Sequence, residues 1–288
     1  MNQLNLFIEL TRLKKPIGFM LLFWPCAWGI TLAYDFSSNL KTYFLYLILF
    51  FLGSVLMRSA GCIVNDILDR KFDEKVFRTK DRPIASGKIS VKLGLFYASI
   101  LCLVAFLVLI NFNFFTIIIA LASMPLAFTY PLMKRLTYWP QLFLGITFNY
   151  GLILGWTSIN AEINLLPLIF YFGAIFWTLG YDTIYGFQDI KDDEIIGLKS
   201  TSIKFKSNPI IFLYICYTIF LLSLIMVGYL SEFNNLYFIF LVIIIYQMYI
   251  LQIKNFNSGE PLSCFKIFKS NNILGMLIFV SLLTGKLN

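Results

Sequence analysis

The apolar stretch YFLYLILFFLGSVLMRSAGCIV (residues 43–64) runs directly into the charged stretch NDILDRKFDEKVFRTKDRPIASG (residues 65–87). Arg58 is the one charged residue in the first stretch, which is long enough to cross a bilayer, because a membrane helix needs about 20 apolar residues. The second stretch is charged from its start. The junction therefore predicts a transmembrane helix that ends in a charged segment at the membrane surface.

The composition places the whole chain in a membrane. Of its 288 residues, 59% are hydrophobic and 13% are charged, whereas a soluble domain carries about 25% charged residues. In lipid, only helices satisfy the backbone internally without closing a barrel, so we expect an all-α integral membrane protein. The chain has no His and no C-x-x-C spacing among its five Cys. This excludes His-based metal ligation and His general-base chemistry, and it argues against a zinc site or a disulfide framework.

Hydropathy predicts nine transmembrane helices in a single bundle, so that residues 1–288 form one polytopic membrane domain. The predicted spans cover residues 17–34, 43–64, 93–110, 114–133, 139–157, 165–184, 209–230, 236–253 and 271–287.

Lys and Arg residues predict the orientation of the bundle, because they accumulate on the cytoplasmic side. With nine spans, 20 of the 23 Lys and Arg residues fall on one side, Lys41 and Lys286 fall on the other, and Arg58 lies within a span. We therefore expect a multi-pass protein of the inner (cytoplasmic) membrane, with the acidic loops and the N-terminus in the cytoplasm and the C-terminus outside. The net charge of +8 reflects this bias and attraction to anionic membrane lipid, and no nucleic-acid partner is expected.

Two acidic motifs recur at the same helical spacing. Asp69 and Asp73 are four residues apart and lie on one face of a helix, with Asp66 close to that face. Adding 120 residues to Asp69 and Asp73 gives Asp189 and Asp193, at the end of the sixth span. We therefore expect two weakly repeated four-helix halves, each of which ends one helix in an acidic stripe.

The motifs predict a Mg²⁺ site for a phosphorylated substrate. Converging carboxylates repel one another unless a cation lies between them, and Mg²⁺ is usually held by a few carboxylates together with substrate phosphates. The expected ligands are Asn65, Asp69, Asp73, Asp189 and Asp193. The cations that follow the motifs and suit phosphate oxygens are Arg78, Lys80, Arg82 and Lys199. The alternative is that charged loops merely cap membrane helices, but the repetition at matched positions favours a site.

Specific sequence patterns extend over most of the chain. N-D-x-x-D-x-x-x-D with R-P-x-x-S-G (residues 65–73 and 82–87) resembles the first signature of the UbiA-type intramembrane aromatic prenyltransferases. Y-D-x-x-Y-x-x-x-D-x-x-D-D with I-G-x-K-S-T (residues 181–193 and 196–201) resembles the second. RLKKPIGFMLLFWPCAWG (residues 12–29) and YPLMKRLTYWPQ (residues 130–141) are similar to its 4-hydroxybenzoate branch. One departure is Gly186, where the branch more often carries Ala.

The resemblance implies a nine-helix bundle around a central cavity that opens laterally to lipid. It implies two Mg²⁺ ions that bridge the acidic motifs to the diphosphate of a long polyprenyl donor. Loss of diphosphate would give an allylic cation that attacks 4-hydroxybenzoate ortho to its hydroxyl. The product would be a ubiquinone precursor.

Side chains near the motifs are further candidates. The allylic cation suits aromatic rings, and the candidate rings are Tyr181, Tyr185, Tyr150, Phe148 and Trp177. Asp182 is expected to orient Tyr185, accept the ring proton or position the phenol; alternatively it is an acid in contact with water. Arg58 would bind the acceptor carboxylate or pair with Asp182. Arg135 would meet a substrate anion, Asn149 would bind the acceptor or join two helices, and Tyr181 would also contact the acceptor.

Two rival functions remain open at this stage. One is a UbiA-type enzyme with another acceptor, such as a dihydroxynaphthoate or homogentisate. The other is a cation transporter, because carboxylates in membranes also mark ion pathways. A transporter predicts acids near mid-membrane in several spans, whereas the acids here cluster at one surface, apart from Asp182.

Overall fold

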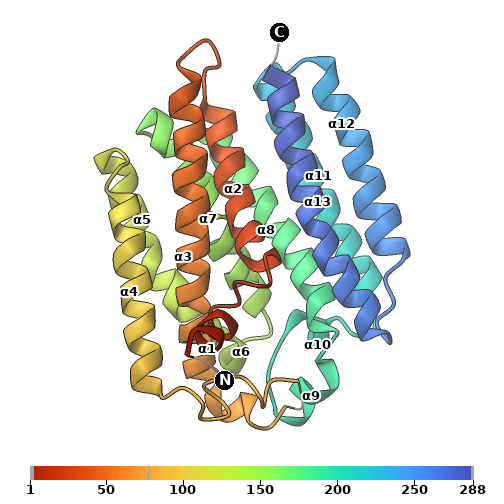
Figure 1. Cartoon of the computed structure of the whole chain (residues 1–288). Coiled ribbons are helices and arrows are strands. Elements are labelled where there is room, and N and C mark those ends of the chain that lie inside the picture. The colour runs from red at the N-terminus through yellow and green to blue at the C-terminus, as the bar shows by residue number, and fades with distance from the viewer. Residues whose placement is uncertain (1–2, 77, 287–288) are drawn as a thin grey trace.

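The computed structural model describes residues 3–76 and 78–286, and every regular element in those ranges is a helix (Figure 1). Eight helical segments there are long and apolar enough to cross a membrane. They are α3 (Leu40–Asp73), α4 (Val91–Leu109), α5 (Phe114–Thr129) continued by η1 (Tyr130–Leu132) and α6 (Met133–Leu136), α7 (Pro140–Asn160), α8 (Leu165–Gly186), α11 (Pro209–Leu230), α12 (Asn235–Ile245) continued by the π-helix η2 (Tyr246–Lys254), and α13 (Pro261–Lys286). The other helices are the apolar α2 (Ile17–Ala33) and the short α1 (Gln3–Leu10), α9 (Ile190–Ile195) and α10 (Thr201–Lys204).

The predicted all-helical membrane fold is confirmed, and each predicted span coincides with an apolar helix. Helix α2 has 17 residues, slightly fewer than the roughly 20 that cross a bilayer. Length and composition therefore support eight spans within the described residues, and the ninth span stays a prediction.

The last helix extends beyond the predicted span. Helix α13 begins at Pro261, ten residues before the predicted start of the span at residue 271. Lys266 and Lys269 lie exposed on this helix, while Cys264 and Ile267 beside them are buried. The first turns of α13 are thus amphipathic, and hydropathy alone does not distinguish an amphipathic turn from a charged loop.

The helices begin with different residues at the two ends of the bundle. Those that start at the end away from the acidic motifs carry an Asn N-cap, whose side chain accepts a hydrogen bond from a backbone N–H of the first turn. These caps are Asn39, Asn113, Asn164 and Asn234. Helices α7, α11 and α13 start at the acidic end with Pro140, Pro209 and Pro261, where a missing N–H costs nothing.

Helices α2 and α7 cross at glycines. A Cβ on Gly29 would lie 2.1 Å from the carbonyl oxygen of Leu152, and one on Gly155 would lie 2.3 Å from that of Cys26. Small residues let membrane helices approach at the backbone, so this crossing fixes the first apolar helix against the middle of the bundle.

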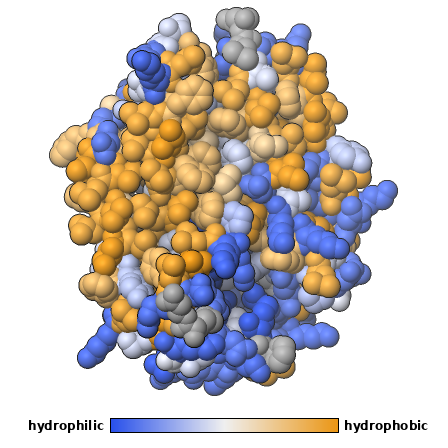
Figure 2. Space-filling model, in the orientation of Figure 1, coloured by the Kyte–Doolittle hydropathy of each residue, from blue (hydrophilic) through white to orange (hydrophobic). Residues whose placement is uncertain are grey.

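The polar ends and the apolar waist of the bundle are visible on the surface. Figure 2 shows hydrophobic residues over most of the bundle, with hydrophilic residues gathered at the lower end, where α1, α6, α9 and α10 lie in Figure 1. Large apolar side chains of the long apolar helices, such as Leu103, Leu107 and Leu222, are exposed, as expected of surface that faces lipid. The acidic motifs and the end of α13 lie at opposite ends of the bundle; which end faces the cytoplasm stays a prediction.

Candidate active site

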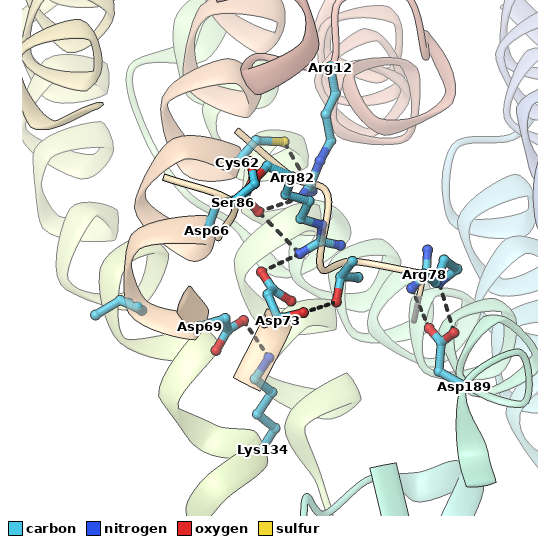
Figure 3. A network of polar contacts seen from close by, with 12 residues as sticks. Arg12, Cys62, Asp66, Asp69, Asp73, Arg78, Arg82, Ser86, Lys134 and Asp189 are labelled. Atoms are coloured by element: carbon cyan, nitrogen blue, oxygen red, sulfur yellow. Dashed lines mark hydrogen bonds and ion pairs between the residues drawn. The ribbon is translucent and has the colours of Figure 1, made fainter. Parts of the chain in front are cut away.

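Three carboxylates lie buried at the end of α3, where its apolar part gives way to charged turns. Asp66, Asp69 and Asp73 are 2%, 1% and 7% exposed. A buried carboxylate is costly unless it is paired and hydrogen-bonded. Figure 3 shows that cations from other segments of the chain provide the pairing.

Asp66 is held by two arginines. Nη2 of Arg12 donates to Oδ1 of Asp66, and Arg12 adopts a left-handed backbone with φ 56°, which is uncommon for a non-glycine residue. Nη1 of Arg82 lies 3.2 Å from the same oxygen and 2.8 Å from Oδ2 of Asp73. Arg82 therefore bridges two of the acids, and Arg12 ties the segment after α1 to α3.

Asp69 is paired with the two cations of α6. Nζ of Lys134 donates to Oδ2 of Asp69. Nη2 of Arg135 lies 3.4 Å from Oδ1 of Asp69 and donates to the carbonyl of Leu68 at 2.6 Å. Lys134 is therefore the main partner of Asp69, and Arg135 chiefly holds α6 against the end of α3.

The second motif is built differently from the first. Helix α8 ends at Gly186, so Asp189 and Asp193 do not continue it, which corrects the expectation of a second stripe on the sixth span. The N–H of Asp193 donates to the carbonyl of Asp189 at 2.9 Å. The two acids thus keep their helical spacing on the separate short helix α9.

Close packing explains why position 186 is a glycine. A Cβ at this position would lie 2.3 Å from Oγ of Ser202, which donates to the carbonyl of Thr183 at 2.7 Å. The glycine therefore lets α10 pack directly against the end of α8.

The two motifs face the same space. Nε and Nη2 of Arg78, just after α3, donate to the two carboxylate oxygens of Asp189, with the Nε–Oδ1 distance at 2.8 Å. Lys134, which binds Asp69, also interacts electrostatically with Asp193. Burial and the Asp189 carboxylate raise the pKa of Asp193 to about 6, against the opposing effect of Lys134 and Arg78. Lys134 therefore links Asp69 of α3 to Asp193 of α9, and Arg78 links the segment after α3 to Asp189.

The donors of both motifs fit Mg²⁺ by their chemistry, because carboxylate oxygens are ligands that hard cations prefer. Asn65, half-buried one turn before Asp69, adds an amide oxygen. Within residues 3–76 and 78–286, no three acidic or cysteine side chains lie close enough together to hold a metal ion, and Arg and Lys side chains bind the carboxylates instead. A metal ion at these carboxylates would therefore compete with the paired Arg and Lys side chains.

Arg58 lies deeper on α3. Its guanidinium lies over the Phe148 ring, 5.4 Å from the centroid, and interacts electrostatically with Tyr130 and Tyr185. Asp182, near the end of α8, lies in the field of Arg58, but these two described side chains form no ion pair. A direct pair between them, one of the two expected roles of Arg58, is therefore not found.

Two buried polar atoms lie close to this region without partners. Nδ2 of Asn149 donates to the carbonyl of Gly145 and to Oγ1 of Thr178, at 2.8 and 2.7 Å, so the expected interhelical bond is present. Oδ1 of Asn149 and the hydroxyl of Tyr181 have no hydrogen-bond partner among the described residues. An unsatisfied buried polar group costs about 1–3 kcal/mol. Such atoms therefore suit a bound ligand or water.

Aromatic rings adjoin the acidic motifs. Tyr185 packs on Phe268 of α13, with ring centroids 4.3 Å apart, and Tyr181 packs on the same ring at 5.8 Å. Trp177 is fully buried and meets Tyr181 edge-on at 5.0 Å. Three of the five predicted rings therefore form one cluster with Phe268.

Two predicted residues make contacts other than those with the acids. Nζ of Lys199 donates to the carbonyl of Leu136 at 3.2 Å, and its backbone N–H donates to the carbonyl of Lys134 at 2.8 Å, so its expected contact with the diphosphate stays a prediction. Tyr150 packs on Tyr171, with ring centroids 6.2 Å apart, and is not part of the cluster around Phe268. Lys80 is exposed in the loop after α3.

Sequence reasoning does not identify Arg12 and Lys134 as site residues. The sequence does contain a pattern that points to both residues, because each lies in a basic run next to an apolar span. Arg12 lies in RLKK (residues 12–15) and Lys134 lies in KR (residues 134–135). The runs look like ordinary charges that set topology, and only the folded chain shows which member of each run contacts a carboxylate.

The model of the UbiA prenyltransferase family matches residues 22–281. The mitochondrial 4-hydroxybenzoate polyprenyltransferases of Bos taurus and Homo sapiens are 42% and 41% identical to this chain, each over 98% of this chain and 75% of the relative. A 4-hydroxybenzoate geranyltransferase of Lithospermum erythrorhizon is 39% identical, over 98% of this chain and 90% of the relative.

Solved structures share the fold. A UbiA homolog from Aeropyrum pernix K1 superposes with a TM-score of 0.73 at 20% identity, covering 92% of this chain and 96% of that one. A UbiA homolog from Archaeoglobus fulgidus bound to DMAPP and Mg²⁺ has a TM-score of 0.71 at 18% identity, covering 96% and 99%.

Proposed function

The chain belongs to the UbiA prenyltransferase family, and on this premise we propose that it transfers a polyprenyl group from a polyprenyl diphosphate to 4-hydroxybenzoate, at the carbon ortho to the hydroxyl. Relatives about 40% identical over nearly the whole chain are named for this activity. The acidic site offers the charges that such a donor requires.

The observation that carries the proposal is that Lys134 binds Asp69 and interacts with Asp193, while Arg78, just after α3, binds Asp189. An allylic diphosphate is inert until its leaving group is neutralised, and bound Mg²⁺ supplies that positive charge. The residues that would hold the metal are Asn65, Asp69, Asp73, Asp189 and Asp193. Lys134, Arg78 and Arg82 exchange their carboxylates for diphosphate oxygens and hold the leaving group as the C1–O bond breaks.

The acceptor lies deeper than the diphosphate. Arg58, which pairs with no carboxylate in the described part of the chain, binds the carboxylate of 4-hydroxybenzoate. The unpaired atoms of Asn149 and Tyr181 hydrogen-bond to the acceptor, and Arg135 meets a substrate anion at the rim. Tyr185 borders the reacting carbon of the donor.

The bond changes balance as an aromatic substitution. The C1–O bond breaks and its electron pair leaves on the diphosphate. The ortho carbon of the phenol then forms a bond to C1 and loses its proton to a base. Asp182, in the field of Arg58, is our candidate for that base.

We also propose a cellular setting. The protein would lie in the inner (cytoplasmic) membrane with its acidic end in the cytoplasm; with nine spans, the distribution of 20 Lys and Arg on one side against two on the other supports this orientation. The product would be a ubiquinone precursor. Several relatives are named as mitochondrial.

Product analysis tests the proposal. The purified protein in lipid with Mg²⁺ is incubated with polyprenyl diphosphates of several lengths and with 4-hydroxybenzoate, a dihydroxynaphthoate and homogentisate. We expect mass spectrometry to find prenylated 4-hydroxybenzoate as the main product. Prenylation of another acceptor instead would reassign the substrate. Mg²⁺ flux in proteoliposomes without donor, together with no prenylated product, would overturn the enzyme reading in favour of a transporter.

A further inference from the structure

A buried network of amides fixes the last helix against α8. Oδ1 of Asn271 on α13 accepts from Nε1 of Trp177 on α8 at 2.8 Å. Nδ2 of Asn271 donates to Oε1 of Gln252 at 3.2 Å, and the Tyr217 hydroxyl donates to the same oxygen at 2.6 Å. Asn271, Gln252 and Trp177 are all fully buried. Polar side chains that satisfy one another inside a membrane protein hold their helices in one register.

The π-helix η2 supplies part of this network. Gln247 and Gln252 both lie in η2, and Nε2 of Gln252 donates to Oε1 of Gln247 at 2.9 Å. Nε2 of Gln247 in turn reaches Oγ of Ser270 on α13 at 3.2 Å. Short π-helical segments in α-helices often occur at functional sites. Here the wider turn places the side-chain amides of Gln247 and Gln252 against α13. Helix α13 is therefore hydrogen-bonded to η2 as well as to α8.

The register of α13 determines where Phe268 lies. Phe268 precedes Asn271 by three residues, almost one helical turn, and its ring lies 4.3 Å from Tyr185 and 5.8 Å from Tyr181. Tyr185 interacts electrostatically with Arg78, the cation that binds Asp189. Phe268 is therefore the ring on α13 that reaches the aromatic residues next to the diphosphate cations.

We propose that Phe268 is a catalytic residue that borders C1 of the prenyl donor, shields the allylic cation from water and stabilises it with its ring. The inference rests on the proposed function. A ring face attracts a cation, and a closed apolar site prevents hydrolysis of a reactive intermediate. Unlike its two tyrosine neighbours, Phe268 offers no phenol oxygen that the cation could alkylate.

The proposal predicts how the cation partitions. After the C1–O bond breaks, C1 either bonds to the ortho carbon of the acceptor, which loses a proton, or bonds to water, which loses a proton and gives prenyl alcohol. Loss of the Phe268 ring favours the second outcome. This ratio of two products is independent of how much protein is folded, so it separates a role in the reaction from a role in stability.

The experiment measures prenyl alcohol and prenylated 4-hydroxybenzoate in parallel for the parent, Phe268→Leu and the near-isosteric Phe268→Met. Phe265→Leu is the matched control, because Phe265 lies on the same helix beneath Lys269, 4.4 Å from its ammonium. A cation–π contact of ordinary strength corresponds to about a 2- to 30-fold change. We expect the alcohol-to-product ratio to rise by that factor in both Phe268 variants and to stay at the parent value in Phe265→Leu.

Two results overturn the proposal. The first is an unchanged ratio in both Phe268 variants, even if their rates fall, because the ring then acts only in packing. The second is an equal rise in Phe265→Leu, because the effect then belongs to α13 as a whole. A parent enzyme that makes no prenylated 4-hydroxybenzoate at all would instead refute the proposed function.

Discussion

Replacing Lys134 by Met should expose how the protein stabilises its acids when no metal is bound. Asp69 is 1% exposed, and Lys134 is its main partner. The variant keeps most of the length of the side chain but removes its charge. Asp69 is then left with Arg135 at 3.4 Å, a distance at which a hydrogen bond is weak.

The expected cost follows from burial. Removing one partner of a fully buried ion pair costs about 3–5 kcal/mol. Lys134 is 27% exposed and Arg135 remains nearby, so we scale the cost down to about 1–3 kcal/mol. For a chain of this size, such a loss lowers the melting temperature by roughly 2–5 °C.

The assay is thermal unfolding of the purified protein in detergent, with chelator present. Lys206→Met is the matched control, because Lys206 pairs with Glu194 at the surface, where both side chains are more than a third exposed, and such pairs contribute about 0–1 kcal/mol. Adding Asp69→Asn to Lys134→Met should recover stability, because the unpaired charge is removed. The reasoning is refuted if Lys134→Met has the same melting temperature as Lys206→Met. It is also refuted if the double variant is no more stable than Lys134→Met.

Two further predictions concern substrate and metal binding. Arg135→Ala should raise the KM for the donor or the acceptor by several-fold, and steady-state kinetics identical to the parent for both substrates would leave Arg135 as only a topological charge. The affinity for Mg²⁺ should fall as the pH drops below about 6, because the raised pKa of Asp193 means that its carboxyl must then release a proton to bind metal. Mg²⁺ titrations by calorimetry between pH 5 and 7.5 measure this, and Asp193→Asn, which has no such proton, should lose most of the dependence.

Hydropathy is sufficient to predict most of the fold, because a membrane span is a local property of about 20 residues. The predictions differ from the structure where the mean hydropathy of a segment does not reveal its local structure. The start of α13 is amphipathic, so Lys266 and Lys269 resemble a loop. Helix α8 ends before Asp189, and the four-residue spacing on α9 conceals this break.

The acids of the site were predictable from their spacing, but their partners were not. Arg12 binds Asp66 across 54 residues of sequence, and Lys134 binds Asp69 across 65. No local pattern encodes such contacts. Lys199, which follows the second motif as Arg78 follows the first, instead contacts the carbonyl of Leu136, so similar sequence positions do not give similar contacts.

The central claim is that both acidic motifs hold one metal–diphosphate site. Mn²⁺ binding, followed by electron paramagnetic resonance in the presence of inorganic diphosphate, measures this directly in the parent, Asp69→Asn and Asp189→Asn. We predict that each substitution alone weakens diphosphate-dependent Mn²⁺ binding at least tenfold and abolishes prenyl transfer, while the protein still inserts in the membrane. Parent-like Mn²⁺ binding and full transfer activity in either variant would contradict the account.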